Sequence, residues 1–356
     1  MQKELATIVL TGKHIQEIIL QVGLNTIMDQ LIENTYEAFV NFNNTDSLMT
    51  KRSGFNYTEP HEGLVEWMPI RKISQDEILI KVVGYHPQNP AEYQIPTIIS
   101  TISKYNTKTG NLTALIDGVL PTSLRTGAIS AVASKLFAKS DSESLGLIGC
   151  GAQAITQLHG MSRVFNLKKV FYYDVDVITQ NSFESRISML NLDCEFIPTT
   201  IKNILAESDI ISTATSIGIG EGPLFKNETT KDWLHINAIG SDFPGKFELP
   251  LQFLKKSYIC PDWIEQAKIE GECQQLEKAD IGEDLSFCLK EANRVNHLKE
   301  KPTVFDSTGI ALQDLVVSKL FLDYAYEMQL GHKLNIENAL IDEKNPYSFT
   351  KSLKQN

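Results

Sequence analysis

Residues 145–154 read LGLIGCGAQA, an apolar run that passes into the pattern G-x-G-x-x-A. At such a junction Gly149 allows the tight turn that ends the strand, and Gly151 lets the backbone approach a pyrophosphate. The helix expected to begin at Ala152 and Gln153 offers backbone amides and the positive end of its dipole to the same phosphates. The segment therefore predicts a strand, a turn and a helix that together bind a dinucleotide.

An acidic residue stands where this kind of site needs one. Asp174 follows the next apolar run, 169–173, and lies 25 residues after Gly149. A carboxylate at the end of that strand accepts hydrogen bonds from the ribose hydroxyls and repels a 2′-phosphate. We therefore predict that the cofactor is NAD rather than NADP.

Apolar runs and helical stretches alternate on both sides of this segment. The runs expected to form strands are 145–149, 170–174, 209–213, 235–240, 258–260 and 304–306. Helical periodicity is found over 121–138 and 309–330. Such alternation is typical of βαβ units on a doubly wound parallel sheet, so we expect a Rossmann-type α/β domain.

The part of the chain before residue 121 has a different pattern. After a short apolar strand at 6–10, apolar residues recur at three- and four-residue steps to about residue 32, which predicts helix. From about residue 63 a strand pattern takes over, with a loop typical of a hairpin at 106–110. The expected strands are 64–69, 78–83, 96–105 and 111–117. They predict an antiparallel sheet in a second domain.

Length and composition limit the class of protein. The 356 residues are enough for two domains, and 42% hydrophobic with 22% charged residues is the composition of a globular protein. The 33 Lys and Arg against 44 Asp and Glu leave a net charge of −11, which disfavours nucleic acid and anionic membranes as partners. No apolar run is long enough for a membrane span or a signal peptide, so we expect a cytoplasmic protein. The five cysteines include no C-x-x-C pair and the seven histidines no H-E-x-x-H motif, so we expect neither a disulfide framework nor a metal site.

Further segments carry a resemblance to a known family. They are EWMP at 66–69, KVVGYHP at 81–87, LRTGA at 124–128, GSDFPGKFEL at 240–249 and DSTGIALQD at 306–314. Over about residues 5–345 the chain resembles the ornithine cyclodeaminase/mu-crystallin family. Two segments, KVVGYHP and IEGECQQL at 269–276, are most similar to bacterial ornithine cyclodeaminases within it.

The resemblance implies both an architecture and an activity. Residues 1–125 and 315–356 are expected to form an α+β domain for substrate binding and dimerisation, and 126–314 the NAD-binding Rossmann domain of a homodimer. The implied enzyme oxidises L-ornithine at Cα with NAD, lets the distal amine attack the imine, expels ammonia and returns the hydride to give L-proline. Related possibilities are lysine cyclodeaminase, alanine or opine dehydrogenase and ketimine reductase, or a mu-crystallin-like binding protein without enzymatic activity.

An amino-acid substrate brings a carboxylate into this acidic protein, so its site must supply local positive charge. By the resemblance the three cations are Arg52, Lys81 and Arg125. Lys51 or a displaced loop is an alternative to Arg52, because the spacing to Glu66 differs from the family pattern. Lys81 could instead face solvent on an edge strand, and Arg125 could be a charge on a helix surface.

Hydride leaves Cα readily only when the amine is neutral, so a carboxylate should accept its proton. Asp242 is the first candidate, because it follows the expected strand 235–240 and ligands bind beyond the carboxyl ends of such strands. The alternative is a helix N-cap or turn residue before Pro244. Glu66 is the second catalytic candidate, and its alternative is a solvent-facing strand acid. Which carboxylate serves which substrate nitrogen stays open.

Two further segments are candidates for contact with the cofactor. The first follows the expected strand 209–213 and would line the adenosine or ribose side. The second would approach the nicotinamide, where a small residue allows the backbone to contact a ring. These residues are Thr213, Ala214 and Thr215 in the first segment and Thr308 and Gly309 in the second.

Overall fold

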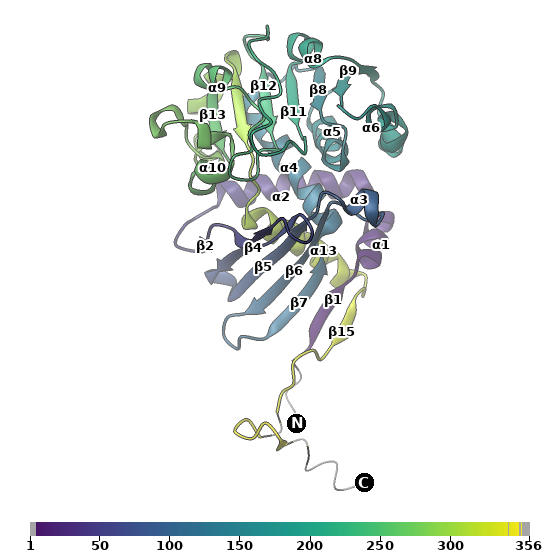
Figure 1. Ribbon diagram of the computed structural model, residues 1–356. Helices are drawn as coiled ribbons and strands as arrows, with labels where there is room; N and C mark the ends of the chain where they lie inside the picture. Colours follow the sequence, from purple (N-terminus) through teal and green to yellow (C-terminus); the bar gives the residue numbers. More distant parts are fainter. Residues whose placement is uncertain (1–4, 341, 349, 351–356) are drawn as a thin grey trace. The chain divides into compact units, whose positions relative to one another are not determined.

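The computed structural model describes residues 5–340, 342–348 and 350 (Figure 1). By its contacts the chain divides into two compact units. The first unit consists of Met1–Gln21, Asn44–Leu120 and Ser318–Asn356, and the second of Val22–Asn43 and Pro121–Val317.

A seven-stranded parallel sheet forms the centre of the second unit, with the strand order β10-β9-β8-β11-β12-β14-β13. The strands are β8 (Ser144–Ile148), β9 (Lys169–Tyr173), β10 (Glu195–Pro198), β11 (Ile210–Thr213), β12 (His235–Ala238), β13 (Tyr258–Pro261) and β14 (Thr303–Asp306). The chain runs outward from β8 to β10 and returns to the other side of β8 as β11. Such a reversal of winding is where ligands bind in open α/β sheets. The predicted Rossmann-type sheet is confirmed, and β10 is a strand that the apolar pattern did not predict.

Helices flank this sheet and bury its apolar side chains. They are α2 (Leu24–Val40), α4 (Val119–Phe137), α5 (Ala152–Val164), α6 (Val177–Asn181), α7 (Phe183–Ile187), α8 (Ile201–Glu207), α9 (Leu251–Lys256), α10 (Ile264–Glu270), α11 (Leu285–Lys290), α12 (Ala292–Val295) and α13 (Ala311–Glu327), of which α4 and α13 extend into the first unit. Ile211, Ile236 and Val304 at the sheet centre are fully buried, as expected for parallel strands covered on both faces.

Two glycines bring α4 and α5 into backbone contact. A Cβ atom at Gly127 would lie 2.2 Å from the carbonyl oxygen of Thr156, and one at Gly160 would lie 2.5 Å from the carbonyl oxygen of Gly127. Only glycine fits at either position while the helices stay this close.

The first unit contains an eight-stranded sheet with the order β15-β1-β7-β6-β5-β4-β2, in which β3 also pairs with β4. Its elements are β1 (Thr7–Leu10), α1 (Gly12–Val22), β2 (Ser47–Met49), β3 (Ser53–Tyr57), β4 (Gly63–Lys72), β5 (Glu77–Tyr85), α3 (Asn89–Glu92), β6 (Ile98–Asn106), β7 (Leu112–Asp117) and β15 (His332–Leu334). All pairs are antiparallel except β1 with β7. The predicted antiparallel sheet and the hairpin loop at 106–110 are confirmed, whereas β2, β3 and β15 were not predicted.

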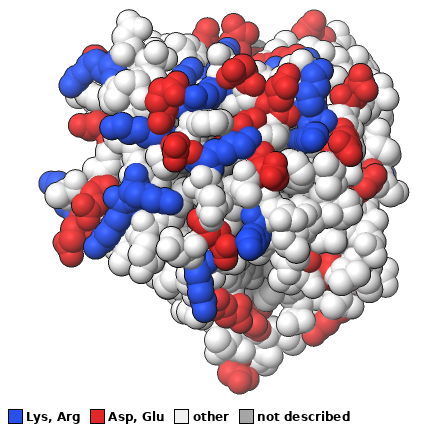
Figure 2. All heavy atoms as spheres, turned by 90° about the horizontal axis from the view of Figure 1, so that it is seen from above, with Lys and Arg blue, Asp and Glu red and all other residues white. Residues whose placement is uncertain are grey.

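Charge is mixed on the surface seen in Figure 2, where Lys and Arg lie interspersed with Asp and Glu. The net charge of −11 is therefore not gathered into one acidic patch on this face. Within the described residues, no helix combines the length and the apolar character needed to cross a membrane.

Candidate active site

The loop that follows β8 has the geometry of a pyrophosphate cradle. Gly149 has a φ of +94°, and a Cβ atom there would lie 2.6 Å from the carbonyl oxygen of Ala214. A Cβ atom at Gly151 would meet no atom within 4 Å, so the backbone is open to a ligand at this point. Helix α5 begins at Ala152, directly after this opening, and Gln153 lies in its first turn. The residues present therefore fit the phosphates of a dinucleotide.

Asp174 follows β9 and is tied to the same loop. Its Oδ2 accepts from the backbone amide of Cys150 at 2.7 Å, and its Oδ1 accepts from the amide of Asp176 at 2.9 Å. The guanidinium of Arg186 also binds this loop. Its Nη2 donates to the carbonyl oxygen of Cys150 at 2.7 Å and to that of Thr179 at 2.8 Å. The carboxylate of Asp174 is thus held beside the turn that the fingerprint defines.

The residues after β11 lie against the same turn. The backbone amide of Ala214 donates to the carbonyl oxygen of Ile148 at 2.9 Å. The hydroxyls of Thr213 and Thr215 both donate to the carboxylate of Glu248. Thr213 is fully buried, so its hydroxyl serves this internal contact.

Thr308 and Gly309, which follow β14, are held by two buried side chains. Asp262 accepts from the Thr308 hydroxyl at 3.0 Å and from the Gly309 amide at 2.7 Å. Gln266 donates through Nε2 to the carbonyl oxygen of Gly309 at 2.9 Å. Gly309 has a φ of +80°, and a Cβ atom there would lie 2.8 Å from Nη1 of Arg125. The candidate nicotinamide segment therefore lies next to a candidate carboxylate-binding cation.

Arg125 is buried in the second turn of α4, so the alternative of a charge on the helix surface is wrong. Its Nη1 donates to Oε1 of Gln313, and its Nε lies 3.4 Å from Oδ1 of Asp314, which is fully buried. Both partners lie in the first turn of α13. They hold the guanidinium in one orientation, as bidentate recognition of a carboxylate requires.

Asp242 lies beyond the carboxyl end of β12, in the loop that leads to Leu249. No helix starts at this residue, since α9 begins only at Leu251, so the N-cap alternative is wrong and the turn alternative stays open. Its side chain is 43% exposed, and its Oδ1 lies 3.9 Å from Nζ of Lys246. This carboxylate is therefore accessible from solvent and lies near an ammonium group.

The remaining candidates share one face of the sheet in the first unit. Met68 pairs with Lys81 and Glu66 with Val83 across β4 and β5, so Glu66 and Lys81 point to the same side. Nη1 of Arg52, just before β3, lies 3.5 Å from Oε2 of Glu66. Lys81 is 1% exposed on an interior strand, which excludes the edge-strand alternative, and the Glu66 side chain is only 13% exposed.

Arg52 and its neighbour differ in their surroundings. Lys51 is exposed, whereas the Arg52 side chain is 10% exposed and paired with Glu66. The unit thus brings two cations and a carboxylate together on one sheet face, with Arg52 rather than Lys51 in the pair.

Several polar residues that support these candidates, all but one of them buried, were not predicted from the sequence. They are Arg186, Glu248, Asp262, Gln266, Glu272, Asp306, Gln313 and Asp314. Most of them stand in segments already noted for the family resemblance, and that resemblance was the available signal. Within the described ranges, no group of three or more His, Cys, Asp or Glu side chains is arranged to hold a metal ion, and all five cysteines are free thiols.

Comparison with known proteins gives consistent matches over nearly the whole chain. The model of the ornithine cyclodeaminase/mu-crystallin family matches residues 13–329. The L-lysine cyclodeaminase of Streptomyces rapamycinicus is 38% identical over 346 residues, which cover 96% of this chain and 99% of the relative.

Solved structures match as well. A lysine cyclodeaminase whose structure explains recognition of L-lysine, L-ornithine and L-2,4-diaminobutyric acid has a TM-score of 0.93 at 40% identity, covering 96% of this chain and 99% of its own. An archaeal alanine dehydrogenase dimer with bound NAD has a TM-score of 0.80 at 29% identity, covering 93% of this chain and all of its own.

Proposed function

Because the chain belongs to the ornithine cyclodeaminase/mu-crystallin family, we propose that it is a cyclodeaminase that converts an L-α,ω-diamino acid into a cyclic amino acid and ammonia. The family segments favour L-ornithine, with L-proline as the product. The similarity to lysine cyclodeaminase makes L-lysine, with L-pipecolate as the product, the second substrate to test. The observation that carries the proposal is the presence, in one chain, of a complete NAD fingerprint and of the cations and carboxylates that a diamino acid needs.

The cofactor is NAD, in keeping with the fingerprint and with the NAD-bound relative. The chemistry that NAD would supply when bound is the reversible acceptance of a hydride from the substrate Cα. The turn from Gly149 to Gly151 would hold the pyrophosphate, and Asp174 the adenosine ribose. Thr308 and Gly309 would contact the nicotinamide.

The substrate carboxylate would be bound by Arg52, Lys81 and Arg125. Arg125 has the most defined geometry, since Gln313 and Asp314 fix its guanidinium on the helix. A bidentate contact to a carboxylate then orients the substrate as well as attracting it.

Asp242 would accept a proton from one substrate nitrogen and Glu66 from the other, so that the α-amine is neutral when Cα loses hydride and the distal amine is neutral when it attacks the imine. The overall reaction involves no net oxidation: a C–N bond forms between the distal nitrogen and Cα, the C–N bond to the departing ammonia breaks, and Cα regains the hydride that it lost.

The decisive experiment incubates the purified protein with a catalytic amount of NAD and with L-ornithine, L-lysine or L-alanine. From L-ornithine or L-lysine the proposal predicts cyclic product and ammonia in equal amounts and almost no accumulation of NADH, whereas L-alanine has no distal amine and should give no cyclic product. With substrate deuterated at Cα and excess unlabelled NADH, the product should keep its deuterium. Stoichiometric NADH with an oxo acid would instead identify an amino-acid dehydrogenase, and no turnover would favour a nucleotide-dependent binding protein.

We also infer that the protein forms a homodimer through its first unit. The face of the sheet opposite Glu66 and Lys81 is apolar and exposed at Phe55, Trp67 and Val82, which lie on neighbouring strands. Exposed apolar surface of this kind often marks a protein–protein contact, and we assign this face to contact with a second copy of the chain.

A further inference from the structure

Glu248 is a buried carboxylate that joins two loops of the second unit. Its Oε1 accepts from the backbone amide of Thr215 at 2.9 Å and from the Thr215 hydroxyl at 2.7 Å. Its Oε2 accepts from the backbone amide of Gly240 at 2.9 Å and from the Thr213 hydroxyl. One side chain thus links the end of β11 to the end of β12, and it is itself fully buried.

The two loops joined in this way serve different parts of the proposed reaction. The loop after β11 lies against the dinucleotide turn, where Ala214 bonds to Ile148. The loop after β12 reaches Asp242 only two residues after Gly240. A continuous set of contacts therefore runs from the cofactor turn through Glu248 to the proposed proton acceptor.

The hydrogen-bonding pattern requires a carboxylate at residue 248. Each oxygen faces a backbone N–H, from Thr215 on one side and Gly240 on the other, and a backbone N–H can only donate. Glutamine would turn its NH₂ group toward one of these donors, so it could hold one loop but not both. The two loops are also in direct contact, since a Cβ atom at Gly240 would lie 2.4 Å from Oε1 of Glu248 and 2.6 Å from the carbonyl oxygen of Thr215.

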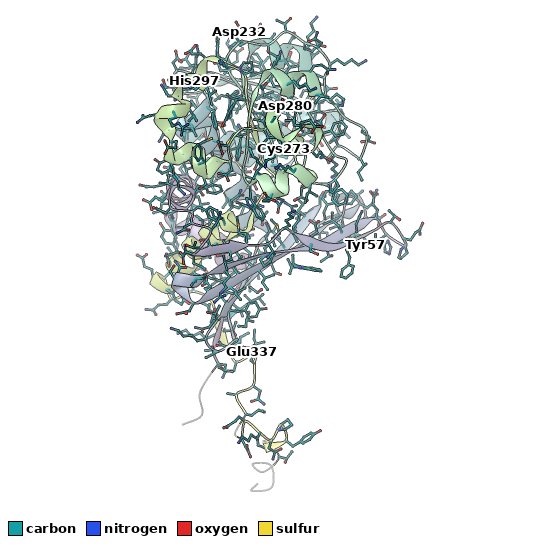
Figure 3. The ribbon with its side chains drawn as sticks, turned by 90° about the vertical axis from the view of Figure 1, so that its left-hand side faces the viewer. Tyr57, Asp232, Cys273, Asp280, His297 and Glu337 are labelled. Atoms are coloured by element: carbon teal, nitrogen blue, oxygen red, sulfur yellow. The ribbon has the colours of Figure 1, made fainter. Side chains whose placement is uncertain are left out.

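A second layer of side chains holds Glu248 and its loop from behind. Oε1 of Glu272 accepts from the backbone amide of Glu248 at 2.6 Å. Asp306 in turn accepts from the backbone amides of Glu272 at 2.9 Å and Cys273 at 2.8 Å; Cys273 is labelled in Figure 3. Gln274 accepts from the amide of Gly245 and donates to the carbonyl oxygen of Lys246, at 2.7 Å each.

Burial of the three linked carboxyl groups, those of Glu248, Glu272 and Asp306, is unfavourable, and apolar side chains could fill the same space with less loss of free energy. Their presence is explained if the loop that they hold must keep one conformation for catalysis.

We propose that Glu248 is a positioning residue that holds the cofactor loop and the Asp242 loop in a single arrangement, with Glu272 and Gln274 as its support. The proposal rests on the proposed function, because it assigns Asp242 to proton transfer. The Glu248 proposal goes beyond the proposed function because it requires a buried carboxylate that touches neither substrate nor cofactor.

The test compares Glu248→Gln with Glu221→Gln. Glu221 also accepts from a backbone amide, that of Gly218 at 2.8 Å, but through Oε2 alone, so glutamine can keep this bond. For Glu248→Gln we expect faster amide hydrogen exchange over 213–215 and 240–249 without cofactor. We also expect about tenfold or greater losses in both NAD affinity and kcat. Glu221→Gln should leave all three measurements unchanged.

A double variant distinguishes positioning of Asp242 from general destabilisation. If Glu248 acts through Asp242, Glu248→Gln should lower kcat less in an Asp242→Asn background than in the wild type, while its effect on NAD affinity persists. Equal losses in both backgrounds would overturn the link to Asp242. Wild-type exchange, affinity and kcat in Glu248→Gln would overturn the whole proposal.

Two milder variants keep the test valid if Glu248→Gln does not fold. Thr215→Val removes one donor to Glu248, and Gln274→Ala releases Gly245; both should shift exchange, NAD affinity and kcat in the same direction by smaller factors. Unchanged values in both would contradict the proposal. Hydrogen exchange and NAD titration need no amino-acid substrate, so they can be read even if the wild type turns over neither ornithine nor lysine, which would count against the proposed function alone.

Discussion

The carboxylate of Asp174 accepts a hydrogen bond from the backbone amide of Cys150, with 2.7 Å between Oδ2 and N. This bond fixes a negative charge on the glycine turn itself. A cofactor whose pyrophosphate lies on that turn must bring its adenosine ribose close to the same charge.

We therefore predict that NAD binds more tightly than NADP, by about tenfold or more, because a 2′-phosphate would face Asp174. Titration of both cofactors by protein fluorescence measures the ratio. Asp174→Ser should reduce the preference for NAD over NADP, because the positive charge of Arg186 remains nearby. The control Asp193→Asn, at an exposed position, should leave this preference unchanged. Equal affinities in the wild type would mean that Asp174 does not meet the ribose.

Asp242→Asn should keep NAD binding and lower turnover by about 10²-fold or more, the usual effect of losing a general acid or base. The matched control is Asp232→Asn, which changes an exposed acid elsewhere in the second unit, labelled in Figure 3. Initial rates and NAD titrations on both variants give the comparison. Near-normal turnover in Asp242→Asn would return this residue to a purely turn-forming role.

Placing a charge on the exposed sheet face should weaken the proposed homodimer. Trp67 is 37% exposed and contacts the ring of Phe55 edge-on, with 5.9 Å between centroids. We expect Trp67→Glu to shift the mass measured by light scattering from dimer toward monomer at micromolar concentration, because a carboxylate would have to be desolvated in the contact.

The control for that experiment is Leu20→Glu, at an exposed position of α1 in the same unit. It should leave the mass unchanged. A wild-type protein that is monomeric at this concentration would rule out the dimer.

His159 should make the protein less stable in acid. Burial, assisted by the charge of Arg163, lowers the pKa of His159 to about 4, against about 6.5 in the unfolded chain. As the pH falls from about 6.5 to about 4, the unfolded chain takes up a proton that the folded protein does not, so stability present above pH 6.5 is lost.

Relative to His159→Gln, the free energy of unfolding of the wild type should fall by up to about 3 kcal/mol between pH 7 and pH 4. Urea unfolding at several pH values measures this difference. Exposed His297→Gln should follow the wild type. A pH-independent difference between wild type and His159→Gln would show that the folded protein protonates His159 as easily as the unfolded chain does.

Local patterns were sufficient for much of the fold. Gly149 and Asp174 follow apolar strands, and the strand–turn–helix context depends on neighbours in sequence, so both could be predicted. The short edge strand β15 could not, because its partner β1 lies at the other end of the chain and its own residues are exposed.

The buried side chains that hold the loops of the candidate site could not be predicted for a related reason. Glu248 bonds to Thr213, and Asp262 to Gly309, across 35 and 47 residues of chain. Nothing in the residues next to Glu248 distinguishes an acid that holds two loops from one that faces water. Only the folded sheet, which sets the ends of its strands side by side, reveals the difference.

The contact between α4 and α5 at Gly127 and Gly160 sets a spacing that reaches beyond helix packing. Arg125 is two residues before Gly127, and α5 begins at the dinucleotide turn. The distance between the backbone of Arg125 and the cofactor turn is therefore set by direct contact between two helix backbones, which no change of side-chain rotamer at the contact can adjust. Under the proposed function, the space at the substrate α-carbon keeps one width, and adaptation to a longer or shorter substrate falls to residues that meet its far end.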